Sequence, residues 1–204
     1  FQSVVPRELE RINGIVERLL ELARPARMNF TLVRLPALMD SVVELYANQL
    51  EARQIEVARE YARDVPPVQA DQEALYRVVV NLVANAIDAM PQGGRLTLRA
   101  GWSEGGDPLL PSRRRAPDRR VKLEVGDTGP GISASESDRI FNPFYTTKEG
   151  GTGIGLALAH KIVEDHGGTI NFRSGRPRGT TFSVVLPLIA EPPAAARLGD
   201  TTPR

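Results

Sequence analysis

One stretch of the sequence is apolar on almost every side, which restricts where it can lie in a folded domain. From Leu75 to Met90 nearly every residue is apolar, and a helix of this kind is buried between other elements. Asp71 is placed to cap its start and Pro91 to end it, which predicts a helix over 72–90. Four polar residues interrupt the pattern on one face, at i, i+4, i+8 and i+11: Arg77, Asn81, Asn85 and Asp88.

Such a polar row needs partners, because an unpaired buried polar group costs about 1 to 3 kcal/mol. A bound ligand is one source of partners, and the neighbouring backbone is the other. Asn81, Asn85 and Asp88 offer hard oxygens of the kind that Mg²⁺ prefers. The row therefore indicates either a ligand site or a set of bonds closed within the protein.

A second candidate follows the strand predicted over 121–125. Asp127 comes directly after this strand, and Gly129, Gly131 and Ile132 follow it. The glycines let a flat ligand approach the backbone closely, and Asp127 is then an acceptor for an exocyclic amine. A turn capped by Asp127 explains the same residues equally well.

A glycine-rich segment that runs from Lys148 into a helix predicted over 154–166 is the third candidate. Free N–H groups at a helix start attract phosphate oxygens, and the lysine adds a positive charge. No lysine followed by Ser or Thr comes after the last glycine, and no strand directly precedes the segment, so neither a Walker A loop nor a dinucleotide fingerprint fits. The residues expected to approach phosphate are Gly151, Thr152, Gly153, Ile154, Gly155 and Leu156.

Three aromatic residues, Phe141, Phe144 and Tyr145, lie in the loop just before these glycines, over 141–148, and Thr147 lies in the same loop. Exposed aromatics are costly unless they dock, so we expect the segment to pack differently when a ligand or partner is bound. An ordinary small hydrophobic cluster is the alternative.

Composition excludes several classes of protein. The 204 residues carry 26 basic and 25 acidic side chains, a net charge of +1, which gives no general attraction to nucleic acid or to an acidic membrane. The absence of cysteine excludes disulfides and thiolate chemistry. No apolar run is long enough to span a bilayer, and no secretory signal opens the sequence.

The remaining pattern predicts a mixed α/β domain. The first 24 residues show apolar positions spaced 4, 3, 4, 3 and 4 apart, typical of a coiled-coil seam, although a surface helix on the main domain is the alternative. A loop over 103–120 is expected to be mobile, and a tail over 190–204 to be disordered. Strands are predicted at 29–35, 55–61, 95–102, 121–125, 169–173 and 180–188, and a further helix at 36–54.

Taken in order, four segments resemble the N, G1, F and G2 boxes of bacterial sensor histidine kinases. They are Asn81-Leu-Val-Ala-Asn85-Ala, Asp127-Thr-Gly-Pro-Gly131, Phe141-Asn-Pro-Phe144 and Gly151-Thr-Gly-Ile-Gly155-Leu. The string from Phe144 to Gly153 is most similar to the nitrogen-regulation type of these kinases. The resemblance assigns residues 25–189 to a catalytic ATP-binding domain and 1–24 to the second helix of a dimerisation hairpin.

The resemblance implies a fold and a ligand. The family fold is a two-layer α/β sandwich of the Bergerat type, shared with gyrase, Hsp90 and MutL, in which ATP binds between helices and sheet under a lid, here 132–150. Asp127 would bind the adenine amine with support from Thr180, and Asn85 would hold Mg²⁺. Asn81 and Lys148 would act catalytically near the phosphates, and the amides of 153–156 would contact them. The implied nucleotide contacts also include Asp88, Gly129, Gly131, Ile132, Phe144, Thr147, Gly151 and Thr152.

One position bears on the type of reaction. Gyrase-like relatives have a glutamate base at the position of Asn81, and an amide cannot take a proton from water. This favours transfer of the γ-phosphoryl group to a histidine of the parent protein, for relay to a response-regulator aspartate. A related ATPase and a nucleotide-gated interaction module remain the alternatives.

The acceptor histidine of the family precedes the second hairpin helix, so we expect it to lie outside this chain. His160 and His166 are not suited to the role; His166 is expected at a helix C-terminus, where a cation complements the dipole. The expected partners are a response-regulator receiver domain and, through a complete hairpin, a second copy of the parent. The chain alone is expected to be monomeric or unnaturally paired, cytoplasmic and free of nucleic-acid or membrane contact, with the parent's membrane attachment open.

Overall fold

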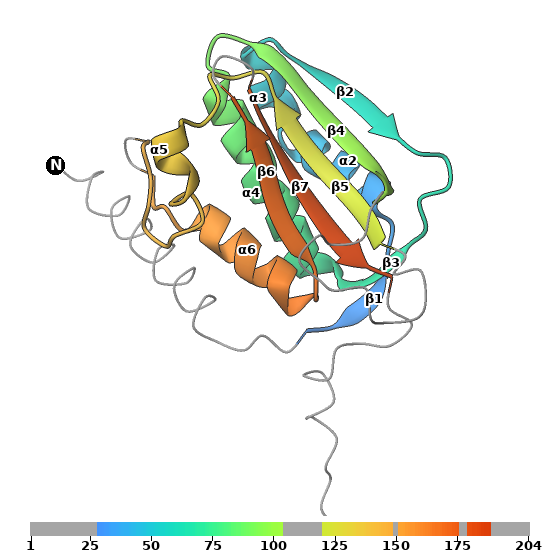
Figure 1. The fold of residues 1–204 in the computed structure, drawn as a ribbon. Helices are drawn as coiled ribbons and strands as arrows, with labels where there is room; N and C mark the ends of the chain where they lie inside the picture. The colour runs from blue at the N-terminus through green and yellow to red at the C-terminus, as the bar shows by residue number, and fades with distance from the viewer. Residues whose placement is uncertain (1–27, 104–119, 149–150, 176–178, 189–204) are drawn as a thin grey trace, which may run out of the picture.

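The computed structural model describes residues 28–103, 120–148, 151–175 and 179–188 (Figure 1). The helix expected over 1–24, the tail expected over 190–204 and nearly all of the loop expected over 103–120 lie outside these ranges. The last residue of that loop is an exception, because Arg120 begins a strand and pairs with Pro187. Its assignment to the loop was wrong, since its backbone continues the ladder of the sheet by one residue.

A five-stranded mixed sheet forms one layer of the fold, in the strand order β2-β4-β5-β7-β6. Its first pair, β2 with β4, is parallel, and the other three pairs are antiparallel. The strands are β2 (Ile55–Tyr61), β4 (Gly94–Trp102), β5 (Arg120–Asp127), β6 (Thr169–Ser174) and β7 (Thr180–Pro187).

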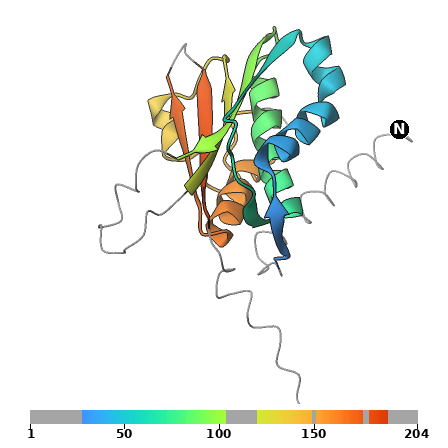
Figure 2. The same cartoon turned by 90° about the vertical axis from the view of Figure 1, so that its right-hand side faces the viewer.

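Helices on one face of this sheet form the second layer, as Figures 1 and 2 show. They are α2 (Leu35–Leu45), α4 (Gln72–Ala89) and α6 (Gly155–Asp165), with the short α3 (Ala47–Ala52) and α5 (Ala134–Ser137) at the edges. The expected two-layer α/β sandwich is therefore confirmed. In the described part of the chain, no helix is long and apolar enough to cross a membrane.

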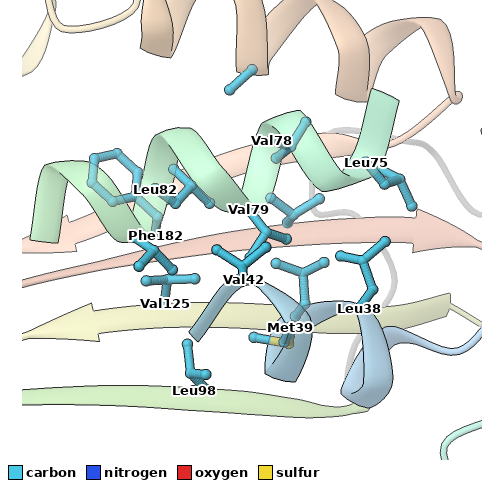
Figure 3. Packing of buried hydrophobic residues seen from close by; sticks show 14 of the residues in the cluster. Leu38, Met39, Val42, Leu75, Val78, Val79, Leu82, Leu98, Val125 and Phe182 are labelled. Carbon is cyan, nitrogen blue, oxygen red and sulfur yellow. The ribbon is translucent and has the colours of Figure 1, made fainter. Parts of the chain in front are cut away.

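The core lies between the layers, with α4 at its centre. Leu75, Val79 and Leu82 of α4 are buried against inward residues of the sheet such as Leu98 and Phe182 (Figure 3). Each fully buried side chain of this size stabilises the fold by about 1.5 to 3 kcal/mol. This packing fixes α4 in rotation as well as in position, so the polar residues on its remaining face are held in one place.

The region between β1 and α4 departs from the sequence-based expectation at two points. A small antiparallel sheet joins β1 (Phe30–Val33) to β3 (Val68–Asp71), a strand that the sequence pattern did not predict. Leu32, although apolar and inside the strand predicted over 29–35, is 69% exposed.

The helix expected over 36–54 is divided into α2 and α3. Tyr46 leaves helical geometry with φ −98° and ψ 8°, and its N–H donates to the carbonyl groups of Val42 and Val43. The break changes the direction of the chain, so that Leu50 of α3 is buried. Gln54, with φ 54°, then ends α3 before β2. A continuous helix was the wrong expectation, because the choice depends on contacts with the core.

His166, the residue directly after α6, links the C-terminal end of α6 to the N-terminal end of α4. Its ring is 3% exposed; Nε2 accepts from the N–H of Asp71 at 3.0 Å, and Nδ1 lies 2.7 Å from the carbonyl oxygen of Ile162. Nδ1 must therefore be the protonated nitrogen of a neutral ring, and burial lowers the pKa of His166. The expectation of a cationic His166 was wrong because both nitrogens already serve neutral bonds.

This neutral histidine makes stability depend on acidity. The folded-state pKa of His166 lies below its value in the unfolded chain, about 6.5, so the unfolded chain binds more protons in acid. We expect the free energy of unfolding to be insensitive to this group above that pH and to fall below it, by up to about 1.4 kcal/mol per pH unit. Urea denaturation between pH 7.5 and 5 checks this.

Two variants isolate the contribution of His166 in that measurement. His166→Gln should remove the acid-dependent part of the loss, whereas His160→Gln should keep it, because the His160 side chain is 39% exposed beside Glu164. Equal pH dependence in the wild type and His166→Gln would contradict this assignment.

Candidate functional site

A cavity of about 560 Å³ lies where α4, the end of the sheet and the segment leading into α6 meet. Its volume falls in the range of sites for small molecules. Most of the residues predicted from the sequence line it: Asn81, Asn85, Asp88, Asp127, Gly131, Ile132, Thr147, Lys148, Gly151, Thr152, Gly153, Gly155, Leu156 and Thr180. Three others, Gly129, Phe144 and Ile154, are not among its lining residues.

One wall is the polar face of α4. Asn81, Asn85 and Asp88 line the cavity, while Arg77 turns to Glu73 at 2.7 Å. The row is therefore split into a cavity-lining part and an ordinary i,i+4 surface pair. The regular spacing on one helix identified the site because α4 is buried on its other sides.

Asp127 ends β5 opposite Thr180 of β7, at the cavity. Its Oδ1 accepts from the N–H of Gly129 at 2.9 Å and, more weakly, from the N–H of Thr180 at 3.3 Å. Within the described residues no donor bonds to Oδ2. Asp127 thus caps its turn, as the simpler interpretation proposed, but with one oxygen only. The second oxygen remains able to accept from a ligand.

Burial is the largest influence on Asp127 and raises the pKa of its carboxyl group. The bonds from Gly129 and Thr180, and the charge of Lys148, act in the opposite direction. Thr180, which pairs with Asp127 across the two strands, is itself held in place, because its Oγ1 lies 2.9 Å from Ser174 Oγ. Asp127 is thus a partly desolvated hydrogen-bond acceptor in a fixed position at the end of the sheet.

The first glycines shape the turn after Asp127. A Cβ on Gly129 would lie 2.7 Å from the carbonyl oxygen of Ala89, so this turn packs directly on the end of α4. Gly131 has φ 76°, a conformation that favours glycine. Gly129 therefore serves close packing, and Gly131 lets the chain turn along the cavity.

The second group of glycines brings the start of α6 to the cavity. Gly153 has φ 66°, and a Cβ there would lie 2.4 Å from the carbonyl carbon of Phe144. A Cβ on Gly155 would lie 2.9 Å from Asn81 Oδ1. Ile154, fully buried, anchors the turn between them. The N-terminus of an 11-residue helix thus adjoins the amide of Asn81, in an arrangement suited to phosphate oxygens.

Lys148 crosses the cavity to α4. Its Nζ donates to Asn85 Oδ1 and to Asp88 Oδ2, each at 2.9 Å. On the opposite side of Asp88, Arg53 Nη1 lies 3.7 Å from Oδ1 and donates to the carbonyl oxygen of Ile87 at 2.8 Å. Asn85 and Asp88 thus have partners within the protein, and the partner that they share is the long, flexible side chain of Lys148.

The aromatic segment divides into two parts. Phe141 packs with His160, Phe172 and Phe182, with ring centroids 5.2 to 6.5 Å apart, which is the ordinary cluster given as the alternative. Phe144 is 60% exposed with φ 67°. The helix α5 was not predicted; its capping box pairs Ser133 with Glu136.

Several lining residues were missed by the sequence reasoning. Val80 and Ala84 directly precede Asn81 and Asn85 on α4, so the helical pattern could have identified them. Tyr46 and Phe182 come from distant segments and carry no local signal. The full set is Tyr46, Val80, Ala84, Ala89, Pro130, Glu136, Ile140, Tyr145, Thr146 and Phe182.

The oxygens of the α4 wall fit a divalent cation. Asn85 Oδ1 and Asp88 Oδ2 already share a positive ammonium group, so they form a site for positive charge. The described ranges contain no group of three His, Cys, Asp or Glu side chains that could hold a metal, so the protein itself offers the ion only these two oxygens. Mg²⁺ commonly takes one or two protein oxygens and completes its shell with waters and phosphate oxygens.

Comparison with known proteins identifies relatives of this fold and site. A family model described as "Histidine kinase-, DNA gyrase B-, and HSP90-like ATPase" matches residues 70–190. The sensor histidine kinase ZraS of Escherichia coli (strain K12) is 37% identical over 91% of this chain and 37% of its own length.

Solved structures give the same result. Full-length ShkA in complex with AMPPNP matches with a TM-score of 0.71 and 25% identity, over 85% of this chain and 35% of its own. The histidine kinase ThkA in complex with the response regulator protein TrrA matches with a TM-score of 0.69 and 28% identity, over 92% of this chain and 50% of its own. The chain thus spans well under half the length of its first curated relatives, about 37%.

Proposed function

The chain belongs to the family of histidine kinase-, DNA gyrase B- and HSP90-like ATPases, as the catalytic domain of a sensor histidine kinase, and we propose that it uses Mg²⁺ and ATP to phosphorylate a histidine of its parent protein. The parent would pass the group to an aspartate of a response regulator. The single observation that carries the ATP site is Asp127, a half-buried carboxylate with one oxygen fixed by backbone N–H groups and the other without a donor among the described residues.

Adenine recognition follows from that arrangement. Oδ2 of Asp127 is an acceptor at the cavity, and the exocyclic amine of adenine is a donor of matching chemistry. Thr180 supports the geometry through its N–H bond to Oδ1. A guanine base carries a carbonyl oxygen at the corresponding position, so two acceptors would meet. The site therefore favours adenine.

The opposite side of the cavity supports binding of the phosphate chain. The start of α6 supplies N–H groups beside Asn81, and Lys148 supplies a positive charge. Asn85 and Asp88 would hold Mg²⁺ through Oδ1 and Oδ2. When bound, the ion would supply neutralisation of charge on the phosphate oxygens. The contribution of the protein is to position these groups and to stabilise developing charge.

Asn81 supports transfer to a protein acceptor over hydrolysis. Its amide lines the cavity and lies against Gly155. An amide cannot accept the proton of an attacking water, so the site lacks a base at this position. This argues against the related ATPase as the function.

The partners of the parent are also proposed. The ThkA structure contains a response regulator, which supports a receiver domain as the partner of this chain's parent. Pairing of two parents through a complete hairpin, with residues 1–24 as its second helix, accords with the heptad spacing. We propose a cytoplasmic site of action, where the nucleotide is available.

Transfer of label tests the proposed reaction. The chain is mixed with γ-labelled ATP, Mg²⁺ and a separately supplied hairpin of the parent that carries its histidine. We expect acid-labile label on that hairpin, and none when its histidine is replaced. Tight ATP binding without any transfer would favour the gated module, and release of phosphate without transfer would favour the ATPase.

Asn85→Ala tests the metal assignment. The change removes one of two cation-binding oxygens, so the enhancement of nucleotide affinity by Mg²⁺ should fall at least tenfold, while metal-free affinity stays near that of the wild type. Isothermal calorimetry with and without Mg²⁺ measures both. Asn171→Ala, at an exposed position of β6, is the control and should keep the full enhancement. An unchanged Mg²⁺ effect in Asn85→Ala would remove Asn85 from the metal site.

A further inference from the structure

We propose that the ammonium group of Lys148 is the resident cation of the Asn85 and Asp88 site when no nucleotide is bound, and that a divalent ion must displace it. This inference rests on the proposed function, because it concerns the same metal site. It goes beyond that function by giving the lysine a second role, as a competitor of the metal for two named oxygens.

The contacts of Lys148 carry the inference. Its Nζ lies 2.9 Å from both Asn85 Oδ1 and Asp88 Oδ2, the length of charge-assisted hydrogen bonds. Asn85 and Asp88 are one turn apart on α4, so their oxygens face the same point. The lysine enters from a segment 60 residues or more away in sequence. A positive charge is thus already bound between the two oxygens that suit a metal ion.

Arg53 explains why Asp88 presents that particular oxygen. Its Nη1 is fixed by the carbonyl oxygen of Ile87 at 2.8 Å and lies 3.7 Å from Asp88 Oδ1. Oδ1 therefore faces the guanidinium group, and Oδ2 is left for the cavity. Because Arg53 keeps its own anchor, Asp88 retains a cation at Oδ1 whichever positive charge occupies Oδ2.

Occupation by lysine and metal is mutually exclusive. A divalent ion that bound the same two oxygens would repel an ammonium group at hydrogen-bond distance from both. The lysine has a flexible four-carbon chain, so its ammonium group can leave without movement of α4. Its backbone is separately held, since its N–H donates to Thr146 Oγ1 at 3.1 Å. Exchange therefore needs a change of side-chain conformation only.

A consequence follows for the order of binding. With the lysine in place, its ammonium group neutralises the charge of Asp88 and occupies the amide oxygen of Asn85, so a free divalent ion gains little free energy by binding there. Phosphate oxygens would offer the displaced ammonium group a new partner and the metal additional ligands. The chain should therefore take up the metal together with a nucleotide and only weakly without one.

The test measures Mn²⁺ binding to the nucleotide-free chain by water-proton relaxation. Lys148→Met keeps an unbranched side chain that is one heavy atom shorter and removes the charge, so Mn²⁺ should bind at least fivefold more tightly than to the wild type. Lys161→Met is the matched control, because Lys161 pairs with Asp165 on α6 at 2.8 Å and does not line the cavity. This variant should bind Mn²⁺ with the affinity of the wild type. Adding Asn85→Ala to Lys148→Met should abolish the gain.

The outcomes separate this inference from the proposed function. Equal Mn²⁺ affinity in the wild type and Lys148→Met would overturn the competition, even where calorimetry shows that both bind Mg²⁺ with an ATP analogue. Failure of the wild type to bind that analogue would overturn the proposed function instead. A gain in both lysine variants would show a general effect of charge and would also overturn the inference.

Discussion

Replacing Asp127 with asparagine is expected to weaken binding of adenine nucleotides by about 100-fold and to leave the empty protein at least as stable as the wild type. The asparagine Oδ1 can still accept from the N–H groups of Gly129 and Thr180. Its amide nitrogen, however, takes the place of Oδ2. A donor then meets the donating amine of adenine, and the charge-assisted bond is lost.

The effect on stability has the opposite sign from the effect on binding. Burial raises the pKa of Asp127, so the folded chain binds more protons than the unfolded chain as pH rises above the unfolded pKa. Over that window, rising pH costs the folded state stability, and at neutral pH the partly desolvated charge is destabilising. Asparagine removes this cost.

Displacement of a fluorescent nucleotide and thermal unfolding of the empty chain measure the two effects. Asp64→Asn is the control, because Asp64 accepts a hydrogen bond from the Trp102 indole far from the cavity, and it should bind nucleotide normally. Wild-type affinity in Asp127→Asn would refute the assigned acceptor. A fall in stability without loss of binding would refute it as well.

Gly179→Ala is expected to cause the largest loss of stability, about 2 to 5 kcal/mol. Gly179 has φ 79°, and a Cβ there would lie 2.0 Å from the carbonyl oxygen of Asp127. Both the left-handed backbone and the backbone contact oppose the substitution. Relief requires β7 to move away from β5 at the pair Asp127 and Thr180, so nucleotide binding should fall with stability.

The same hairpin supplies a matched control. Gly175 precedes Gly179 between β6 and β7, and a Cβ there meets no atom of the described residues within 4 Å. Gly175→Ala should therefore change the free energy of unfolding by less than about 1 kcal/mol. Chemical denaturation of both variants gives the comparison; equal, small effects would show that the contact at Asp127 relaxes without cost.

The central helix and the site along it were predictable from sequence because their signals are local. The apolar run of α4 predicted that the helix is buried. The regular spacing of Asn81, Asn85 and Asp88 then predicted that the three side chains share one face of that helix. The same holds for the glycines before α6, whose pattern indicates a helix start built for close approach. The comparisons confirm the kinase family and the two-layer fold.

Features that depend on distant contacts were not predictable in the same way. The break at Tyr46 is decided by how α2 and α3 pack on the core. The neutral state of His166 depends on the N–H of Asp71, 95 residues away. The bonds of Lys148 to α4 join segments that only the folded chain brings together. In each case local sequence leaves several partners available, and tertiary packing selects one.

The most direct test of the central claim is a calorimetric titration of the wild-type chain with a nonhydrolysable ATP analogue, with and without Mg²⁺, beside the matching GTP analogue. We expect one nucleotide per chain, tighter binding with Mg²⁺, and a clear preference for adenine. Absence of binding, or equal binding of the two bases, would contradict an adenine nucleotide site built on Asp127.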